Sequence, residues 1–313
     1  MTPVSTERPR PVYGVDFSAA ERDAGGKTWI TTGTVVDGGI EIRSVEPLVE
    51  FSSLPSAARS EALRALADWI RGLDEAAVVG LDVPFGLPAF LVEAAGYGSW
   101  RGFITDFPGS LVGDADGDAT DPVRAFAERC VALTDEYGEG TYDKRRTDAA
   151  VGARSPYGFI ADTITCYGMR DVLAPIVDDV RVAPMDTAGD IKRNALEWQP
   201  DAPAGPTLVE TYPAAVFDAL GLCRTKYKGA SDAETTRRRR NAEGLAATGE
   251  LTYKSGERLL DRIVANGGGD ALDSVAACLG AFGALESGYA VTGDSVDPEA
   301  VAVEGYIYAL RGR

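Results

Sequence analysis

The succession of apolar patterns in the first 90 residues constrains the fold of this chain more than any other feature. Four short segments with apolar or alternating character read as strands, at 12–17, 28–36, 40–47 and 76–88. The turn signal "DGG" joins the second segment to the third. Residues 56–73 carry apolar side chains at helical spacing, with Ser56 as the expected N-cap. The pattern predicts an antiparallel three-stranded meander, a crossover helix, and a fourth strand parallel to the first.

The remainder of the 313-residue chain also alternates helix and strand patterns. We expect helices at 121–138, 162–177, 214–221 and 267–285, and strands at 207–213 and 301–309. Asp121 is the expected cap of the first of these helices, and Pro122 takes its first position. Residues 1–11 read as a disordered lead-in, and 12–313 as a single α/β domain in which 89–190 form a helical insertion.

Histidine is absent from the chain, which excludes several kinds of catalytic site. Ser-His-Asp triads, Cys-His pairs and histidine general bases are impossible, and the four dispersed cysteines offer no zinc site. Catalysis would therefore fall to carboxylates, lysine, arginine, tyrosine or serine. The cysteines read as reduced thiols of a cytoplasmic protein. We expect no contact with membranes, because no apolar run is long enough to cross a bilayer and no signal peptide is evident.

The net charge of −17 is extreme for a folded protein. Two explanations are open: a functional acidic surface, or adaptation to a salty cytoplasm, where a Debye length of about 3 Å at 1 M salt screens like charges. Because aspartate is spread along the chain rather than gathered in a tail, we favour a halophilic protein. Its acidity then reflects the solvent more than a binding partner.

Acidic residues stand near the ends of the expected strands and at the start of the helix "GGGDALDSVAACLGAFGAL". They are Asp16, Asp82, Glu210, Asp270 and Asp273. Each has a structural explanation by itself. An aspartate at a strand end often starts a turn, and a glutamate within a strand fits an outward-facing position. Asp270 and Asp273 suit the N-cap and third position of a helix, where they complement its dipole.

Together, the same carboxylates fit a metal site. The expected topology places Asp16 beside Asp82 near the C-terminal ends of parallel strands, the edge at which α/β sheets bind ligands. Hard cations such as Mg²⁺ prefer oxygen ligands. Two such ions about 3.5–4 Å apart promote phosphodiester displacement without a histidine base. Asp270 and Asp273 share one helix face and would complete the cluster, and of these two we favour Asp273.

The motifs "GVDFSAA", "GLDVPFGLP", "VETYPAAVF" and "GGGDALDSVAA" resemble, in order and spacing, those of domain-of-unknown-function family 429. That family is regarded as predicted nucleases of RNase H-like fold. The D-x-x-D pair is also similar to that of Holliday-junction resolvases in the same superfamily. The resemblance spans residues 12–285, with the middle third unmatched, and implies an RNase H-like domain. It implies an acidic site made of Asp16, Asp82, Glu210, Asp270 and Asp273.

Candidate phosphate-binding residues occur after the expected strand at 207–213 and within the insertion. The run "RRRR" at 237–240 fits either a solvated helix face or a phosphate-contacting arm. The substrate-binding candidates are Lys226, Lys228, Arg237, Arg145 and Ser18. Tyr142, Tyr157 and Tyr227 lie near them in sequence, although no RNA-binding signature is present.

The sequence therefore predicts a Mg²⁺- or Mn²⁺-dependent nuclease acting on DNA or RNA. Asp16 and Asp82 would bind the metal, Asp270 and Asp273 would complete the site, and Glu210 would be an outer ligand or activator. One alternative is a phosphoryl-transfer ATPase or kinase on the same core, although the turn "DFSAAERDAGG" lacks a compact phosphate loop. The other is a non-catalytic module that binds metal or nucleic acid.

Overall fold

The computed structural model describes residues 10–112, 121–188, 197–291 and 297–310. The strands in these ranges are β1 (Pro11–Asp16), β2 (Trp29–Val36), β3 (Gly39–Pro47), β4 (Val78–Asp82), β5 (Arg181–Ala183), β6 (Thr187–Ala188), β7 (Glu197–Trp198), β8 (Thr207–Thr211), β9 (Leu251–Tyr253) and β10 (Ile307–Tyr308). The predicted lead-in at 1–11 falls mostly outside the described residues, and Pro11 already belongs to β1.

Helices connect the strands and cover both faces of the main sheet. They are α1 (Ala24–Lys27), α2 (Leu48–Phe51), α3 (Arg59–Arg71), α4 (Ala89–Ala94), α5 (Trp100–Ser110), α6 (Pro122–Tyr137), α7 (Arg146–Val151), α8 (Ile160–Tyr167), α9 (Pro213–Ala219), α10 (Asp232–Ala247), α11 (Glu257–Ala265), α12 (Asp270–Glu286) and α13 (Pro298–Glu304). A π-helical turn, η1 (Gly168–Leu173), and a 3₁₀ turn, η2 (Ala174–Ile176), continue α8. Within the described ranges, none of these helices combines the length and apolar character needed to span a membrane.

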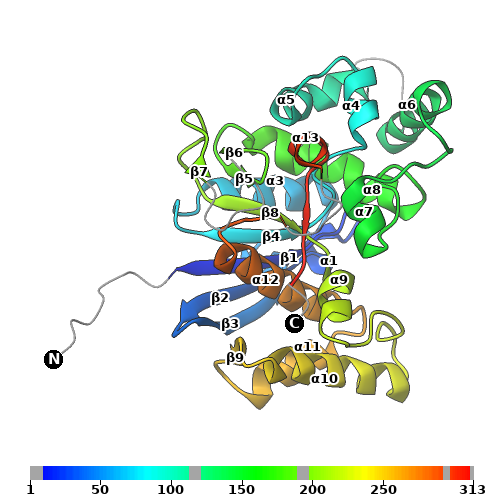
Figure 1. Ribbon diagram of the computed structural model, residues 1–313. Helices are drawn as coiled ribbons and strands as arrows, with labels where there is room; N and C mark the ends of the chain where they lie inside the picture. The colour runs from blue at the N-terminus through cyan, green and yellow to red at the C-terminus, as the bar shows by residue number, and fades with distance from the viewer. Residues whose placement is uncertain (1–9, 113–120, 189–196, 292–296, 311–313) are drawn as a thin grey trace.

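The main sheet is mixed, with the strand order β10-β8-β4-β1-β2-β3-β9 (Figure 1). β1, β2 and β3 pair antiparallel, whereas β1–β4, β4–β8 and β8–β10 are parallel pairs. β5 pairs with residues 207–209 of β8, and β10 pairs with residues 210–211 of the same strand. The predicted meander and parallel fourth strand are therefore confirmed, and the chain is an α/β protein.

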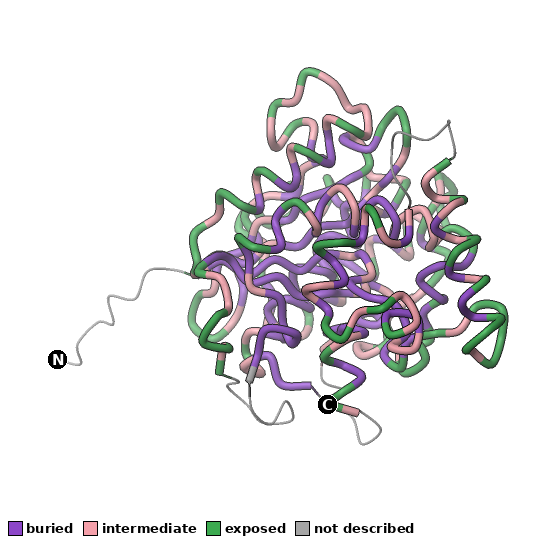
Figure 2. Tube along the Cα trace, turned by 90° about the horizontal axis from the view of Figure 1, so that it is seen from above, coloured by how far each residue is buried: buried purple, intermediate pink, exposed green. Residues whose placement is uncertain are grey.

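Two hydrophobic layers enclose the sheet, because successive side chains of a strand point to opposite faces. One layer contains Val15 and Leu81 with the buried face of α3, and the other contains Val12 and Val78 with α12. Figure 2 shows that the buried residues gather in the middle of the molecule and that intermediate and exposed residues surround them. The four cysteines are free thiols, as expected from their spacing.

Helix α12 lies directly on the sheet because glycines in β1 and β4 leave room for its backbone. A Cβ atom on Gly14 would stand 2.1 Å from the carbonyl oxygen of Ser274 and 2.2 Å from the backbone nitrogen of Cys278. A Cβ on Gly80 would stand 2.5 Å from the carbonyl oxygen of Ala277. These close approaches fix the height and position of α12 over the two central strands.

We therefore expect Gly14→Ala to destabilise the fold by displacing α12. Overpacking of a well-packed core typically costs about 1–3 kcal/mol, and here the obstructing atoms belong to backbone rather than to flexible side chains. Urea denaturation of the purified chain would measure the loss. Gly98→Ala is the matched control, since a Cβ there meets nothing within 4 Å. Equal stability of Gly14→Ala and the wild type would contradict this view of the contact.

Several local predictions are corrected by the structure. Ser56 does not cap α3: the N-cap is Ala58, and the Ser56 hydroxyl accepts a hydrogen bond from the Ala58 N–H, which forms a local turn instead. The expected strand at 301–309 is the end of α13 followed by the short β10. By contrast, Asp121 does cap α6, accepting a hydrogen bond from the backbone of Val123.

The predicted insertion at 89–190 is helical over most of its described length, but its last part contributes β5 to the main sheet. Phe103 and Phe126 from this region share one hydrophobic cluster with Leu66 of α3. The inserted helices are thus packed onto the same face of the sheet as the crossover helix.

Candidate functional site

Asp16 and Asp82 lie side by side at the C-terminal ends of two parallel strands. β1 and β4 pair in register so that Asp16 is the direct neighbour of Asp82. Side chains alternate between the two faces of a strand. Asp16 therefore points to the same face as Val12 and Gly14, and Asp82 to the same face as Val78 and Gly80. This is the face that α12 covers. Two carboxylates are therefore placed next to each other below the start of that helix.

The first turn of α12 brings Asp270 and Asp273 to the same edge. The expectation that Asp270 is the N-cap is wrong: the cap is Gly269, in a left-handed conformation (φ 84°), and Asp270 is the first helical residue. Asn266 instead accepts the backbone hydrogen bond of Ala271 (3.2 Å). Because Asn266 does this, the Asp270 carboxylate is not used as a cap and remains part of the acidic group.

Lys228 and Tyr227 supply the polar partners of this acidic group. The Lys228 ammonium lies 2.7 Å from Oδ2 of Asp273 and 4.0 Å from Oδ1 of Asp270. The hydroxyl of the buried Tyr227 donates a hydrogen bond to Oδ1 of Asp273 (2.8 Å). Asp273 is thus engaged at both oxygens, whereas Asp270 faces the open cavity. Of the pair, Asp270 is the more accessible to a ligand, contrary to our preference for Asp273.

Arg238 holds the segment that carries Lys228. This member of the "RRRR" run is buried, and its guanidinium donates hydrogen bonds to the carbonyl oxygens of Tyr227 (2.7 Å), Gly229 (2.7 Å) and Val264 (2.9 Å). Neither of the interpretations offered for the run, solvated face or phosphate arm, describes this residue. Its role follows from tertiary contacts that the spacing of four consecutive arginines does not indicate.

Burial and mutual repulsion raise the pKa values of the clustered carboxylates. Burial is the largest cause for Asp16, whose pKa is well above its ordinary value, and the Asp273 charge adds to it. Burial followed by Asp273 raises the pKa of Asp82 to about 8. Burial also raises the pKa of Asp270 and of Asp273, although Lys228 opposes the shift in both. For Lys228 itself burial favours the neutral form, but the carboxylates outweigh it and raise the pKa.

The four carboxylates of the cluster outnumber the two ammonium groups near them, those of Lys228 and, beside Asp270, Lys27. Such a group is stabilised either by protonation or by an added cation. Within the described ranges, no three acidic or cysteine side chains already stand as a closed set of metal ligands. Lys228 forms the ion pair with Asp273, and its side chain is half exposed.

Glu210 belongs to the opposite face of the sheet. It follows Val209, which packs against the α12 layer, and pairs in register with Leu81, which packs in the α3 layer. Its carboxylate accepts two hydrogen bonds from Arg145 (2.5 and 2.7 Å) and one from the backbone of Phe85 (3.0 Å). Burial raises the pKa of Glu210, and Arg145 opposes that shift. Glu210 lines the same cavity but is held by an arginine.

Arg145 is fully buried between two carboxylates. Besides Glu210 it contacts Asp148, with Nε–Oδ2 and Nη2–Oδ1 distances of 2.9 and 2.8 Å, and it donates to the carbonyl oxygen of Glu304. With its donors engaged inside the protein, Arg145 positions Glu210, and the substrate contact expected of it does not follow from this geometry. Its partner Asp148 was not singled out from the sequence, although it follows Arg145 by three residues.

Of the other substrate-binding candidates, one lines the cavity at the acidic cluster and two do not. Ser18 follows β1 and lines the cavity with the acidic cluster. Lys226 is exposed, and its carbonyl oxygen accepts a hydrogen bond from Arg237 (3.1 Å). Neither Lys226 nor Arg237 is among the described residues that line this cavity.

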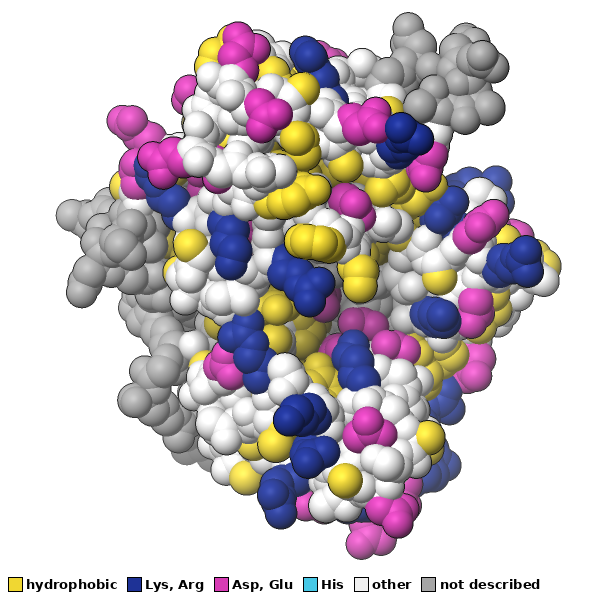
Figure 3. All heavy atoms as spheres, turned by 90° about the vertical axis from the view of Figure 1, so that its right-hand side faces the viewer, with side chains coloured by type: hydrophobic (Ala, Val, Ile, Leu, Met, Phe, Trp, Pro, Cys, Tyr) yellow, Lys and Arg dark blue, Asp and Glu magenta, His cyan; other side chains and the backbone are white. Residues whose placement is uncertain are grey.

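The acidic cluster opens into a cavity of about 640 Å³. Asp16, Asp82 and Asp270 line it, and so do Arg154, Ile160 and Ile164 from the region of α7 and α8. Figure 3 shows this face of the molecule, where Lys and Arg side chains surround a hollow that has acidic side chains at its bottom. Arg154 was not selected from the sequence, and only its place in the lining of this cavity distinguishes it.

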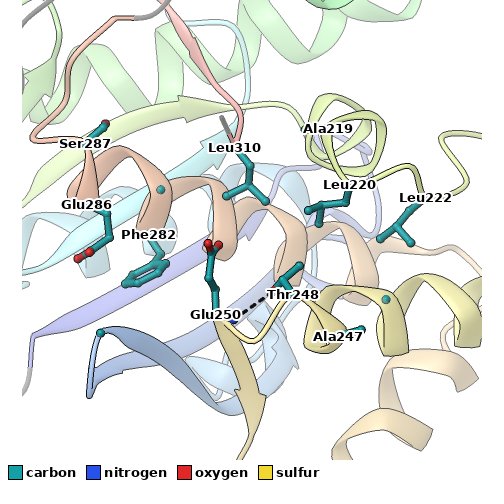
Figure 4. A pocket seen from close by; sticks show the side chains of 13 residues that line it. Ala219, Leu220, Leu222, Ala247, Thr248, Glu250, Phe282, Glu286, Ser287 and Leu310 are labelled. Carbon is teal, nitrogen blue, oxygen red and sulfur yellow. Dashed lines mark hydrogen bonds between the residues drawn. The ribbon is translucent and has the colours of Figure 1, made fainter. Parts of the chain in front are cut away.

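A second cavity, of about 690 Å³, lies near the other end of α12. Leu220 and Leu222 line it together with Phe282 and Leu310, and the acidic residues Glu250 and Glu286 stand at its border (Figure 4). Among the described residues that line it there is no lysine or arginine, and no aspartate. Size alone therefore does not identify the site, and the chemistry points to the cavity at the edge of the sheet.

Comparisons of this chain with protein-family models, with curated proteins and with solved structures find no match.

Proposed function

We propose that this chain is a divalent-metal-dependent nuclease of RNase H-like fold. The observation that carries the proposal is the gathering of Asp16, Asp82, Asp270 and Asp273 from three separate elements at one end of the sheet. The fold assignment is supported by the antiparallel meander of β1, β2 and β3, continued by β4 and β8 in parallel. It is the arrangement that the resemblance to family 429 implies.

The donor chemistry of the cluster fits a hard divalent cation. Carboxylate oxygens are the ligands that Mg²⁺ and Mn²⁺ prefer, and burial together with the charge of neighbouring carboxylates raises the pKa values of Asp16 and Asp82. In addition, the buried hydroxyl of Thr211, which also lines the cavity, has no hydrogen-bond partner in the part of the chain that the structure describes. Bound there, such a cation would activate water and neutralise charge on a phosphodiester.

The chain's own residues would then take distinct roles. Asp16, Asp82 and Asp270 would hold the cation, and Asp273 would anchor Tyr227 and Lys228. Lys228, half exposed beside the cluster, would turn towards the scissile phosphate once its carboxylate partners are neutralised. Glu210 would keep its contact with Arg145 and shape the far wall of the cavity.

Cleavage assays on the purified wild-type chain test the proposal. We expect Mg²⁺ or Mn²⁺ to support cleavage of labelled DNA or RNA, and EDTA to abolish it, when single-stranded, duplex and branched substrates are resolved on denaturing gels. Hydrolysis of ATP with all nucleic acids left intact would overturn the proposal in favour of a phosphoryl-transfer enzyme. A rise in melting temperature with metal, without any reaction, would favour a non-catalytic module.

A further inference from the structure

An aromatic surface with cationic neighbours adjoins the proposed active site. Phe159 and Tyr142 expose 73% and 44% of their surface, although large apolar side chains of this chain are mostly buried. Their ring centroids are 5.5 Å apart, and Tyr142 also packs against Tyr157 at 6.0 Å. The backbone of Phe159 has a φ of 52°, which is rare for a residue with a large side chain.

Buried contacts of Tyr157 and a close approach at Gly158 hold these aromatic side chains in place. Tyr157 is fully buried, and its hydroxyl bonds with the Thr134 hydroxyl (2.9 Å) and accepts from the Asp143 N–H (2.6 Å). Gly158 leaves space for the neighbouring ring, since a Cβ there would stand 3.2 Å from Cδ1 of Tyr142. The aromatic side chains are thus presented to solvent on an ordered support.

The cavity beside these rings, of about 470 Å³, contains two cations and an unsatisfied hydroxyl. Lys144 and Arg154 line it, both are exposed, and in the described ranges neither has an acidic partner. Unpaired cations are notable in a chain with a net charge of −17. Ser155 also lines the cavity, is only 5% exposed, and its hydroxyl has no hydrogen-bond partner among the described residues.

The aromatic cavity adjoins the acidic one. Arg154 lines both cavities. Phe159 lines the aromatic cavity and the next residue, Ile160, lines the acidic cavity, with 71% of its surface exposed. A ligand that occupies both would meet aromatic faces first, then a cation, and then the carboxylates.

We propose that Phe159 and Tyr142 stack unpaired bases of a single-stranded nucleic acid, while Lys144 and Arg154 bind its phosphates and direct the strand into the acidic cavity. This inference rests on the proposed nuclease function and names its substrate class. Exposed aromatic rings beside a cationic groove are the combination by which proteins bind single strands without reading sequence. The bases of a duplex are already stacked on one another and do not offer their faces to such rings.

Fluorescence anisotropy in EDTA tests binding separately from cleavage. The probes are labelled single strands of dT and of U, a duplex, and an abasic single strand of the same length. We expect Phe159→Ala to weaken binding of the base-containing strands by about 5- to 150-fold, the range for loss of one stacked base. Tyr137→Ala, which removes an exposed aromatic ring outside the cavity, should leave binding unchanged.

The abasic strand separates stacking from general charge attraction. The wild type should bind it more weakly than Phe159→Ala binds dT, because Tyr142 can still stack a base in that variant, and Phe159→Ala should not weaken binding of the abasic strand further. Lys144→Ala should weaken both strands, whereas Lys254→Ala, at an exposed lysine between β9 and α11, should weaken neither. Preference for dT over U, or the reverse, identifies the nucleic acid.

Two failures can be told apart. Equal affinity of Phe159→Ala and the wild type for single strands, or tighter binding of duplex, overturns the inference even if the chain cleaves nucleic acid. Single-strand binding that depends on Phe159, without metal-dependent cleavage of any strand, supports the binding surface and overturns the proposed function.

Discussion

The Asp82→Asn variant should lose metal-dependent cleavage by roughly 10³-fold or more, and in EDTA it should melt at a higher temperature than the wild-type chain. The loss of activity follows from the proposed role, because a bound metal supplies several kcal/mol of transition-state stabilisation and each 1.36 kcal/mol is a factor of ten. The gain in stability follows from the site itself: asparagine keeps the shape of the side chain and removes a half-buried charge beside Asp16.

The stabilisation should depend on pH in a defined direction. Burial, and then the charge of Asp273, raise the pKa of Asp82 from 3.8 to about 8, so folding favours the protonated carboxyl. The stability that this protonated form contributes is complete below pH 3.8 and is lost as the pH rises towards about 8. The melting temperatures of variant and wild type should therefore be similar below pH 3.8 and diverge up to about pH 8.

Calorimetry across this pH range and gel-based cleavage assays on the same preparations would measure both effects. Asp135→Asn is the matched control, since Asp135 is an exposed aspartate on α6, and it should change neither activity nor melting temperature. Retained cleavage by Asp82→Asn would remove this residue from the active site. A melting temperature below that of the wild type would show that Asp82 makes a stabilising interaction instead.

The sequence is sufficient to predict the central sheet and the Asp16–Asp82 pair because both depend on local patterns. The meander follows from strand periodicity and a turn signal, and the crossover helix makes the fourth strand parallel to the first. Both aspartates end their strands and pair in register. Once the topology is known, their convergence requires no further information.

The environment of the cluster is less accessible to sequence reasoning because it depends on contacts between distant segments. Asn266, and not Asp270, satisfies the start of α12. Arg238 lies in a run of four arginines, but only its burial against the carbonyl oxygens of Tyr227 and Val264 shows that it holds the Lys228 segment. Which arginine of a charged helix turns inward is decided by packing and not by composition.

Glu210 shows the same limit within a strand. Its motif indicated an acidic site residue, but strand alternation turns it to the face opposite α12. There it forms an ion pair with Arg145. The two residues are 65 positions apart in the sequence, so no local pattern predicts that they pair. The resulting buried group of one guanidinium and two carboxylates sets the second large effect that we expect.

Arg145→Met should destabilise the chain by about 3–5 kcal/mol, the usual cost of removing one partner from a buried ion pair. Methionine fills similar space, but it leaves the carboxylates of Glu210 and Asp148 buried without the donors that now contact them at 2.5–2.9 Å. Lysine should not rescue the loss, because a single ammonium cannot reproduce the two-sided contacts of a guanidinium. Urea denaturation would measure the change in the free energy of unfolding.

Two further variants separate the structural role of this group from a catalytic one. Arg124→Met removes an arginine whose ion pair with Glu128 lies at the surface, and it should leave stability unchanged. Glu210→Gln should reduce stability and lower cleavage only in proportion to the fraction of unfolded chain, if Glu210 serves to hold Arg145. A Glu210→Gln variant that is fully folded and inactive would instead return Glu210 to the metal site as an outer ligand, because only a direct part in the reaction separates activity from folding in that way.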